Sequence, residues 1–292
     1  MNCAAEEYTK VQIESHLISL VGDICVGSKT LNRDMLLKYE EVAKTMPQVG
    51  IPVTHTIHGG MYAREITIPK GTVITGQIYK FNHLDIMISG DITVSTDSGE
   101  TRRFTGYNCF SGMAGKKRAG YAHEDTTWIT VHPVTGNNGD EIQSMITADT
   151  FEELEIFTAS LNRMDYLAMV DKMEMTEQEI RSQVESKLDQ MNMPIGYENL
   201  YVDDSKIEGK GFFSTCKIDA DHVICSSRIN GKRTPAGRYI NHAKQPNATM
   251  KLVDKNIDVI ALKDIEPFEE ITINYSHLLK LRLESEDLKC QE

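Results

Sequence analysis

Residues 237–248, GRYINHAKQPNA, decide how the second half of this 292-residue chain is interpreted. Taken alone, the Asn, His and Pro residues of this stretch are turn formers, which indicates a surface loop. Three other features follow a fixed order around it. GKGFFS precedes it at 209–214, and IDVIALKDI at 257–265 and EEITINY at 269–275 follow it. Because four features in one order are hard to explain by coincidence, the series favours a built site over a loop.

The ordered series resembles the SET domain, the fold of most protein lysine methyltransferases, over residues 201 to about 280. In that family the Gly-x-Gly segment lies against S-adenosylmethionine, and glycine lets the backbone come close to a ligand. The resemblance implies S-adenosylmethionine as the methyl donor and an Asn-His pair that supports a knot-like core. The residues that match the cofactor site are Gly209, Lys210, Gly211, Phe212, Tyr239, Asn241 and His242.

Tyr275, the last residue of EEITINY, matches the catalytic tyrosine of the family. A free lysine has a pKa of about 10.4, so methyl transfer needs surroundings that favour the neutral amine. A narrow apolar channel disfavours the ammonium form by desolvation, and a phenolic oxygen can orient the amine toward the methyl group. The resemblance therefore implies a protein lysine methyltransferase in which Tyr275 positions a lysine of a protein substrate.

This segment departs from the family pattern in its length. Most SET domains insert a substrate-binding subdomain between the positions of Gly211 and Asn241, where this chain has only 29 residues. No Cys-rich zinc tail follows Tyr275, and RTPAGRY at 233–239 looks like the compact bacterial and phage type. The methyl-donor half is thus expected without the usual peptide platform, so the first half of the chain, another subunit or a partner must present the lysine.

The first half of the chain consists of short β-branched or alternating runs between residues 51 and 132, separated by Gly, Pro, Asp and Ser. Evenly spaced short strands of this kind suggest a sandwich or a small barrel. Within them, ITIPKGTVITGQIYKFNHLDIMISGDITV at 66–94 resembles the first motif of the cupins, a family of small β-barrels. The sequence therefore predicts a cupin-like β-barrel, and the resemblance implies a homo-oligomer that assembles through it.

The metal ligands of the cupin pattern are incomplete. Gln77 and Tyr79 stand at the two His positions of that motif, and His83 stands at its Glu position. Since Gln and Tyr replace imidazole poorly at a divalent metal, we expect a barrel without a metal. A divergent metal site made by His83 and His123 stays open as an alternative.

Helical patterns flank the strands. NRDMLLKYEEVAKTM at 32–46 predicts one helix, and two more are predicted between residues 147 and 191, the second opening with the capping box of Thr176 and Glu179. The fold class expected is mainly β with helical segments. The domains expected are an N-terminal helical arm (1–49), a cupin-like β-barrel (50–136), an acidic helical linker region (137–196) and a compact SET domain with a C-terminal helix (197–292).

The formal charge of −12 is concentrated in the middle of the chain. Residues 140–200 hold 14 Asp and Glu against 4 Lys and Arg, whereas residues 201–292 hold 15 against 14. Because phosphate binding needs a basic face, no nucleic-acid partner is expected. The apolar runs are too short for a membrane span, and MNCAAEEYTK has two Glu where a signal peptide carries Lys or Arg. We therefore expect a cytoplasmic protein without a membrane partner, in the host cytoplasm if a phage encodes it.

Two other classes of function stay open. The shortened SET segment and the incomplete ligand set both fit a non-enzymatic assembly protein that uses its two folds for binding. A cupin-type metalloenzyme that works through His83 and His123 is the third hypothesis.

Overall fold

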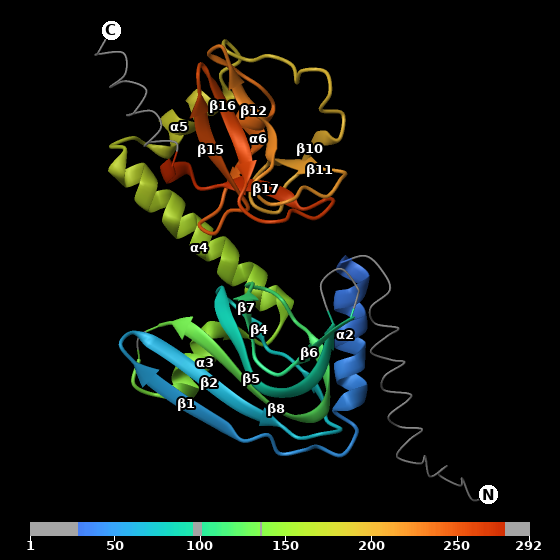
Figure 1. Ribbon diagram of the computed structural model, residues 1–292. Helices are drawn as coiled ribbons and strands as arrows, with labels where there is room; N and C mark the ends of the chain where they lie inside the picture. Colours follow the sequence, from blue (N-terminus) through green and yellow to red (C-terminus); the bar gives the residue numbers. More distant parts are fainter. Residues whose placement is uncertain (1–28, 96–100, 135, 278–292) are drawn as a thin grey trace, which may run out of the picture. The chain divides into compact units, whose positions relative to one another are not determined.

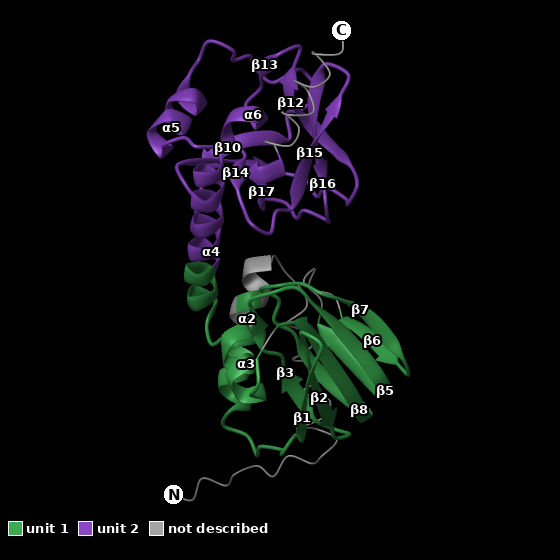
Figure 2. Cartoon of the chain, turned by 90° about the vertical axis from the view of Figure 1, so that its left-hand side faces the viewer, with its two compact units in different colours: residues 1–157 green, residues 158–292 purple. Residues whose placement is uncertain are grey.

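Residues 29–95, 101–134 and 136–277 are described by the computed structural model. The chain forms two compact units, residues 1–157 and 158–292 (Figure 2). Strands dominate both units, so the predicted fold class, mainly β with helical segments, is confirmed. The predicted C-terminal helix and the first part of the predicted N-terminal arm lie outside the described residues.

The first unit is built on a seven-stranded sheet in which β1, β2, β8, β5 and β6 are neighbours in this order (Figure 1). The long strands β5 and β8 each have two partners on one side: β5 pairs with β7 and then β6, and β8 pairs with β2 and then β3. The strands are β1 (Val53–His58), β2 (Met61–Ile68), β3 (Val73–Thr75), β5 (His83–Ser95), β6 (Thr101–Thr105), β7 (Asn108–Gly112) and β8 (Ala119–Pro133).

The predicted β-barrel is a curled sheet that does not close within the part of the chain that the structure describes. The sheet curls, but β1 and β6 lie at its two ends and do not pair with each other (Figure 1). The curl comes from register shifts between Met87 and Ile92 of β5, where one strand bends against the other. An alternating pattern shows which face of a strand is buried, but it does not show which edges of the sheet join.

Apolar side chains fill the inside of the curl. Ile66 of β2 pairs with Trp128 of β8, which pairs in turn with Met87 of β5, so these three form one row across the sheet. The pairing follows from the period of two along each strand, which places alternate side chains on the same face. The buried core here consists of Ile66, Ile68, Met87, Ile92, Val94, Phe104 and Ala122.

His132 of β8 is 1% exposed, and its ring centroid lies 4.7 Å from that of Tyr79 and 4.8 Å from that of His83. Burial, with a smaller contribution from His83, lowers the pKa of His132 to about 4. An imidazole in the unfolded chain titrates near 6.5, so between pH 6.5 and pH 4 the unfolded state binds more protons and the folded state loses stability as pH falls.

We expect His132 to remove about 3 kcal/mol of stability between pH 7 and pH 4. Trp128, the only tryptophan, reports on this unit, so urea unfolding can be followed by its fluorescence. His132→Phe should have a shallower pH dependence than the wild type across this window. Equal pH profiles of the two proteins would rule out this origin of acid sensitivity.

Two helices pack in the first unit. α2 (Lys29–Ala43) buries Leu36 and Tyr39 next to Ala119, whereas Leu37 and Val42 are exposed. α3 (Gly139–Ile146) begins at Asn138, whose side chain accepts hydrogen bonds from the next backbone N–H groups, and it buries two isoleucines. A two-stranded ribbon joins β4 (Ile78–Tyr79) to β9 (Thr147–Ala148).

The two predicted acidic helices are present. α4 (Phe151–Lys172) begins after Thr150, whose hydroxyl accepts from the Glu153 N–H at 3.1 Å, and it contains the division between the two units. α5 (Glu177–Glu185) has the predicted capping box between Thr176 and Glu179, which is confirmed in both directions. None of the helices in the described ranges combines the length and apolar character that crossing a membrane requires.

The second unit contains two four-stranded sheets, one in the order β10-β11-β17-β14 and the other in the order β13-β12-β16-β15. In the first sheet β14 and β17 are parallel, and Asn241 pairs with Thr272. The elements are β10 (Leu200–Asp204), β11 (Lys210–Ser214), β12 (Val223–Ile229), β13 (Lys232–Arg233), α6 (Ala236–Tyr239), β14 (Asn241–His242), β15 (Ala248–Val253), β16 (Asn256–Ala261) and β17 (Glu270–Ile273).

Arg233 ties the end of α5 to the second of these sheets. Its Nη2 donates to Asp189 Oδ1 at 2.7 Å and to the Ser186 carbonyl at 2.9 Å, and its side chain is only 11% exposed. The Arg233 guanidinium holds the pKa of the Asp189 carboxyl below its usual value. A lowered carboxyl pKa gives stability that is present above the unfolded value, near 3.9, and is lost as pH falls below it.

We therefore expect Asp189→Asn to destabilise the second unit by about 1 kcal/mol at pH 7, because the pair is partly exposed to solvent. The difference from the wild type should shrink as pH falls below about 4. Hydrogen exchange of peptides that cover residues 183–191 measures it locally. A difference that is the same at pH 7 and pH 3 would mean that the carboxylate charge is not the cause.

Candidate active site

Strand pairing brings together three motifs that lie far apart in the sequence. β11, which carries the Gly-x-Gly segment, pairs with β17 through Phe212 and Ile271. On its other side β17 pairs with β14, where Asn241 lies beside Thr272, and Tyr275 follows directly after the end of β17. The neighbouring strands β11, β17 and β14 thus bring the motif residues into one region of the second unit (Figure 1 labels β11 and β17, and Figure 2 labels β14).

Tyr275 is held by two hydrogen bonds, one from its side chain and one from its backbone. Its hydroxyl donates a hydrogen bond to the Ile240 carbonyl at 2.8 Å, and its backbone N–H donates to His242 Nδ1 at 3.2 Å. Burial raises the pKa of Tyr275 above its usual value, so the phenol is neutral at physiological pH. Because its one hydrogen is used by Ile240, the phenolic oxygen can only accept a hydrogen bond from a further group.

The protonation of His242 follows from the same contact. Since Nδ1 accepts from the Tyr275 N–H, the hydrogen of the neutral ring is on Nε2, which lies 3.3 Å from Asp165 Oδ2. Burial lowers the pKa of His242, although Asp165 opposes this effect, so the neutral form is favoured. A neutral, oriented imidazole packs with its centroid 5.2 Å from the Tyr275 ring.

Asn241 anchors the turn that precedes β11. Its Nδ2 lies 2.8 Å from Glu270 Oε1, 3.0 Å from Ser205 Oγ and 3.1 Å from both the Glu208 and the Lys210 carbonyl oxygens. An amide NH₂ group has two hydrogens, so these acceptors saturate it. The Asn241 amide nitrogen therefore holds the glycine turn in place, while its backbone stays part of the sheet.

The two glycines of the motif are required for different reasons. Gly209 has φ +54°, the left-handed region, and among the described residues nothing lies within 4 Å of the position of a Cβ. At Gly211 a Cβ would lie 2.5 Å from Glu270 Oε1 and 3.0 Å from the Phe213 ring. Gly209 thus presents open backbone, whereas Gly211 makes room for Glu270.

Three further predicted cofactor residues differ in their surroundings. Phe212 is 1% exposed within the core, so its contact with a ligand would have to go through its backbone. Tyr239, half-buried at the end of α6, packs against that core and has the Arg238 guanidinium 5.1 Å from its ring. Lys210 forms an exposed ion pair with Asp204 at 2.6 Å.

Three residues of α4 that the sequence motifs did not indicate also lie at this site. Asp165 approaches His242, Tyr166 has its ring 6.5 Å from that of Tyr275, and Asn162 accepts a hydrogen bond from the Lys244 N–H at 3.0 Å. Their spacing of three and four residues puts them on one face of the helix. That spacing, in NRMDY at 162–166, was the available signal.

The alternative prediction of a metal site made by His83 and His123 is wrong, because the two side chains lie far apart along β5. His123 Nε2 lies 2.8 Å from Thr93 Oγ1, and Thr93 is ten residues beyond His83 on the same strand. A strand rises about 3.3 Å per residue, so the two imidazoles lie on the order of 30 Å apart along β5. Within the described ranges, no group of three His, Cys, Asp or Glu residues is placed to hold a metal ion.

A family model described as SET domain matches residues 60–276, and the chain belongs to this family. SET domains are in general S-adenosylmethionine-dependent methyltransferases that act on protein lysines. The match begins in the first unit, well before residue 201, where the motifs of the sequence begin. No curated protein sequence matches the chain.

Several solved structures have a limited likeness to part of the chain. Ectoine synthase from P. lautus is 18% identical with a TM-score of 0.29, over 35% of this chain and 78% of that one. A cupin superfamily protein from Desulfitobacterium hafniense is 9% identical with a TM-score of 0.26, over 32% and 88%. A humanized mutant of the Chaetomium thermophilum Polycomb Repressive Complex 2 is 21% identical with a TM-score of 0.23, over 26% and 14%. At these TM-scores none of them carries an argument about function.

Proposed function

We propose that the protein is an S-adenosylmethionine-dependent protein lysine methyltransferase. The observation that carries the proposal is the neutral Tyr275 hydroxyl, held on the Ile240 carbonyl beside the neutral His242 ring. The turn that Asn241 anchors lies on the same three strands, and membership of the SET family supports the activity.

The residues around the glycine turn fit a ligand that is bound mainly through main-chain groups. The open, left-handed backbone at Gly209 can be approached closely, while the Phe212 side chain and the Asn241 amide nitrogen are already used by the protein. The backbones of Gly209, Gly211, Asn241 and His242 and the half-buried Tyr239 ring are the groups we assign to the cofactor. When bound, S-adenosylmethionine supplies the methyl group that a neutral lysine amine accepts.

Tyr275 would act by positioning the lysine amine. Its oxygen can accept an amine N–H because its own hydrogen is bonded to Ile240. An amine that donates to this oxygen has its lone pair directed elsewhere, and orientation of this kind is a large part of the rate of transfer between two bound groups. A phenol with a raised pKa is a poor proton acceptor, so general-base catalysis by Tyr275 is not part of the proposal.

The substrate is proposed to be a lysine of another protein, presented by that protein or by a second copy of this chain. The 29 residues between Gly211 and Asn241 are used for the end of β11 and for β12, β13 and α6, which support the sheets of the second unit. We assign methyl transfer to the second unit, with the motif residues in 197–292 and three more site residues on α4, because every site residue above lies beyond residue 157. The cupin-like fold is assigned to residues 50–136 from the resemblance of residues 66–94.

Calorimetric titration with S-adenosylmethionine tests cofactor binding. The matched variants are Gly209→Val and Gly196→Val, since both glycines have positive φ and open surroundings in the second unit. We expect Gly209→Val to weaken binding about tenfold or more, because a side chain now covers the backbone, and Gly196→Val to bind like the wild type. Absence of heat for the wild type at high micromolar cofactor would reject the proposal.

Incubation with a labelled methyl donor and a host-cell lysate then tests transfer. A labelled lysine in one protein supports the methyltransferase and names its substrate. Cofactor binding without any labelled protein, together with recovery of the chain in a particle at fixed stoichiometry, would instead support the assembly function.

A further inference from the structure

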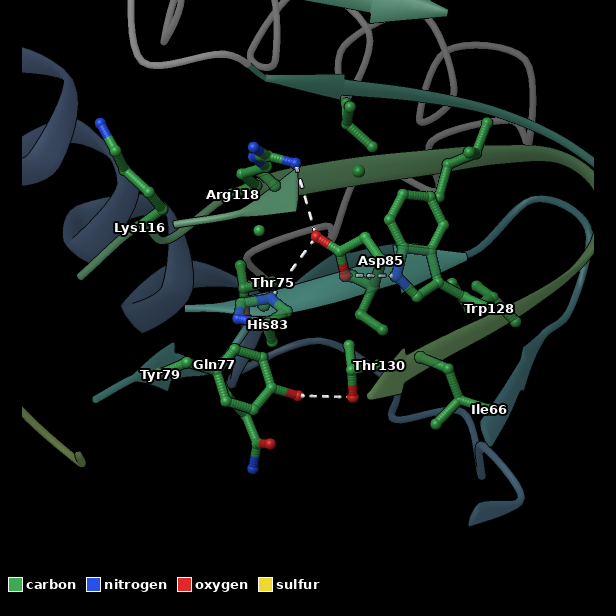
Figure 3. Close-up of a pocket in the computed structure, with 18 of the residues that line it drawn as sticks. Ile66, Thr75, Gln77, Tyr79, His83, Asp85, Lys116, Arg118, Trp128 and Thr130 are labelled. Atoms are coloured by element: carbon green, nitrogen blue, oxygen red, sulfur yellow. Dashed lines mark hydrogen bonds and ion pairs between the residues drawn. The ribbon is translucent and has the colours of Figure 1, made fainter. Parts of the chain in front are cut away.

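A cavity of about 160 Å³ lies in the first unit, on the inner face of the curled sheet (Figure 3). It has no part in the methyl-transfer site, since all of its lining comes from residues 64–130. Apolar side chains make up most of its wall. They are Ile66, Ile68, Ile74, Ile92, Val94 and Trp128.

Strand register places two opposite charges in one row of this wall. Arg64 of β2 pairs with Thr130 of β8, and Thr130 pairs with Asp85 of β5. Neighbouring strands are about 4.8 Å apart, so Arg64 and Asp85 begin about 10 Å apart, on either side of the Thr130 hydroxyl. The register of the strands therefore does not bring the Arg64 guanidinium and the Asp85 carboxylate into an ion pair.

The Asp85 carboxylate is surrounded by protein donors. Oδ1 accepts from Trp128 Nε1 at 2.9 Å, and Oδ2 lies 3.5 Å from His83 Nε2 and 4.0 Å from an Arg118 nitrogen. Figure 3 shows all three contacts meeting at Asp85. The positive charge of Arg118 thus balances the Asp85 carboxylate.

Two other polar groups of the lining are left without a partner. Arg64 Nε and Gln77 Oε1 are buried and make no hydrogen bond within the described part of the chain. Leaving a buried polar group unpaired is unfavourable, and more so when the group is charged. Arg64 Nε and Gln77 Oε1 are therefore available, as a cationic donor and an amide acceptor, to a molecule that enters the cavity.

We propose that this cavity binds a small organic monocarboxylate that carries a hydroxyl or amino group. The carboxylate of the ligand would accept hydrogen bonds from Arg64. Because Arg118 already balances the charge of Asp85, the Arg64 charge is available to the ligand. The hydroxyl or amino group would donate to Gln77 Oε1, and a short apolar body would lie against the isoleucines and Trp128. Cavities of about 150 Å³ hold one benzene-sized molecule, which limits the ligand to a few carbon atoms.

The position of Trp128 in the lining provides a direct assay. Titration of the full-length protein with 2-hydroxybutyrate should give a saturable change of tryptophan fluorescence, confirmed by calorimetry, in the absence of any methyl donor. Butyrate should bind more weakly because it lacks a donor for Gln77, and butanamide should not bind because it has no charge for Arg64.

Three arginine variants test the assigned role. Arg64→Gln should weaken binding of 2-hydroxybutyrate about tenfold or more, the effect of losing one charged hydrogen bond. Arg64→Lys keeps the charge but loses Nε, so its affinity for 2-hydroxybutyrate should lie between those of the wild type and Arg64→Gln. This intermediate affinity would show that the loss in Arg64→Gln is not caused by misfolding. Arg102→Gln, at an exposed position on β6, should bind like the wild type.

Equal binding of butanamide and 2-hydroxybutyrate, or no effect of Arg64→Gln, would overturn the proposal. So would the absence of saturable binding by the wild type at tens of millimolar acid. None of these results bears on methyl transfer, because the assays contain no methyl donor.

Discussion

Tyr275→Phe is expected to reduce methyl transfer to protein lysine about 100-fold while it leaves the affinity for S-adenosylmethionine within about twofold. The variant loses only the oxygen that donates to Ile240 and can accept the lysine amine. The ring and its packing next to His242 and Tyr166 stay, so the fold and the cofactor contacts are retained. Transfer is measured as label incorporated into lysate protein, and affinity by calorimetry.

Tyr201→Phe is the matched control for this variant. Tyr201 lies on β10 with its ring 5.5 Å from that of Phe213, and it also belongs to the second unit. Its hydroxyl has no place in the proposed site, so the control should transfer methyl groups at the wild-type rate. If Tyr275→Phe also transfers at that rate, Tyr275 does not position the lysine. If it loses the cofactor as well, its ring is part of the cofactor site.

Gly90→Ala is expected to destabilise the first unit by about 3 kcal/mol or more. Gly90 has φ +114° in the bent part of β5, and a Cβ there would lie 2.6 Å from both the Asp125 carbonyl oxygen and Thr126 Cα. Both contacts are to the backbone of β8, which no change of rotamer can relieve. Urea unfolding followed by Trp128 fluorescence measures the loss.

Gly60→Ala separates the contribution of backbone conformation from that of the steric contact. Gly60 has φ +77° in the turn between β1 and β2, with nothing within 4 Å of a Cβ position among the described residues. The substitution should therefore cost only the left-handed conformation, about 1–2 kcal/mol. Equal losses at Gly60 and Gly90 would show that the approach of β8 is not what requires glycine at position 90.

The sequence predicted the features that depend on neighbouring residues. The capping box of Thr176 and Glu179 was predictable because it needs one spacing and two residue types. The motifs of the second half were identified by their order, and the structure places Gly209, Asn241 and Tyr275 on or next to the neighbouring strands β11, β14 and β17.

Features that depend on distant pairing could not be predicted in the same way. The open edges of the sheet in the first unit depend on which strands meet, and the hydrophobic pattern of β1 or β6 does not encode this. The approach of Asp165 to His242 joins residues 77 positions apart, so the acidic pattern of α4 indicated only a solvated helix. Gly211 matched a cofactor motif in the sequence, but the structure requires glycine at this position because a Cβ would collide with the Glu270 carboxylate.

Asn247, the last polar residue of the stretch GRYINHAKQPNA, is 3% exposed and lies beside β17. Its amide oxygen accepts from the Thr272 N–H at 2.7 Å, and its amide nitrogen donates to the Glu270 carbonyl at 2.8 Å. One side chain thus takes the place of a peptide group and extends the pairing of β17 at Glu270 and Thr272. A strand from another chain could add at this edge only by displacing Asn247, so this part of β17 is protected against the edge-to-edge aggregation to which short sheets are prone.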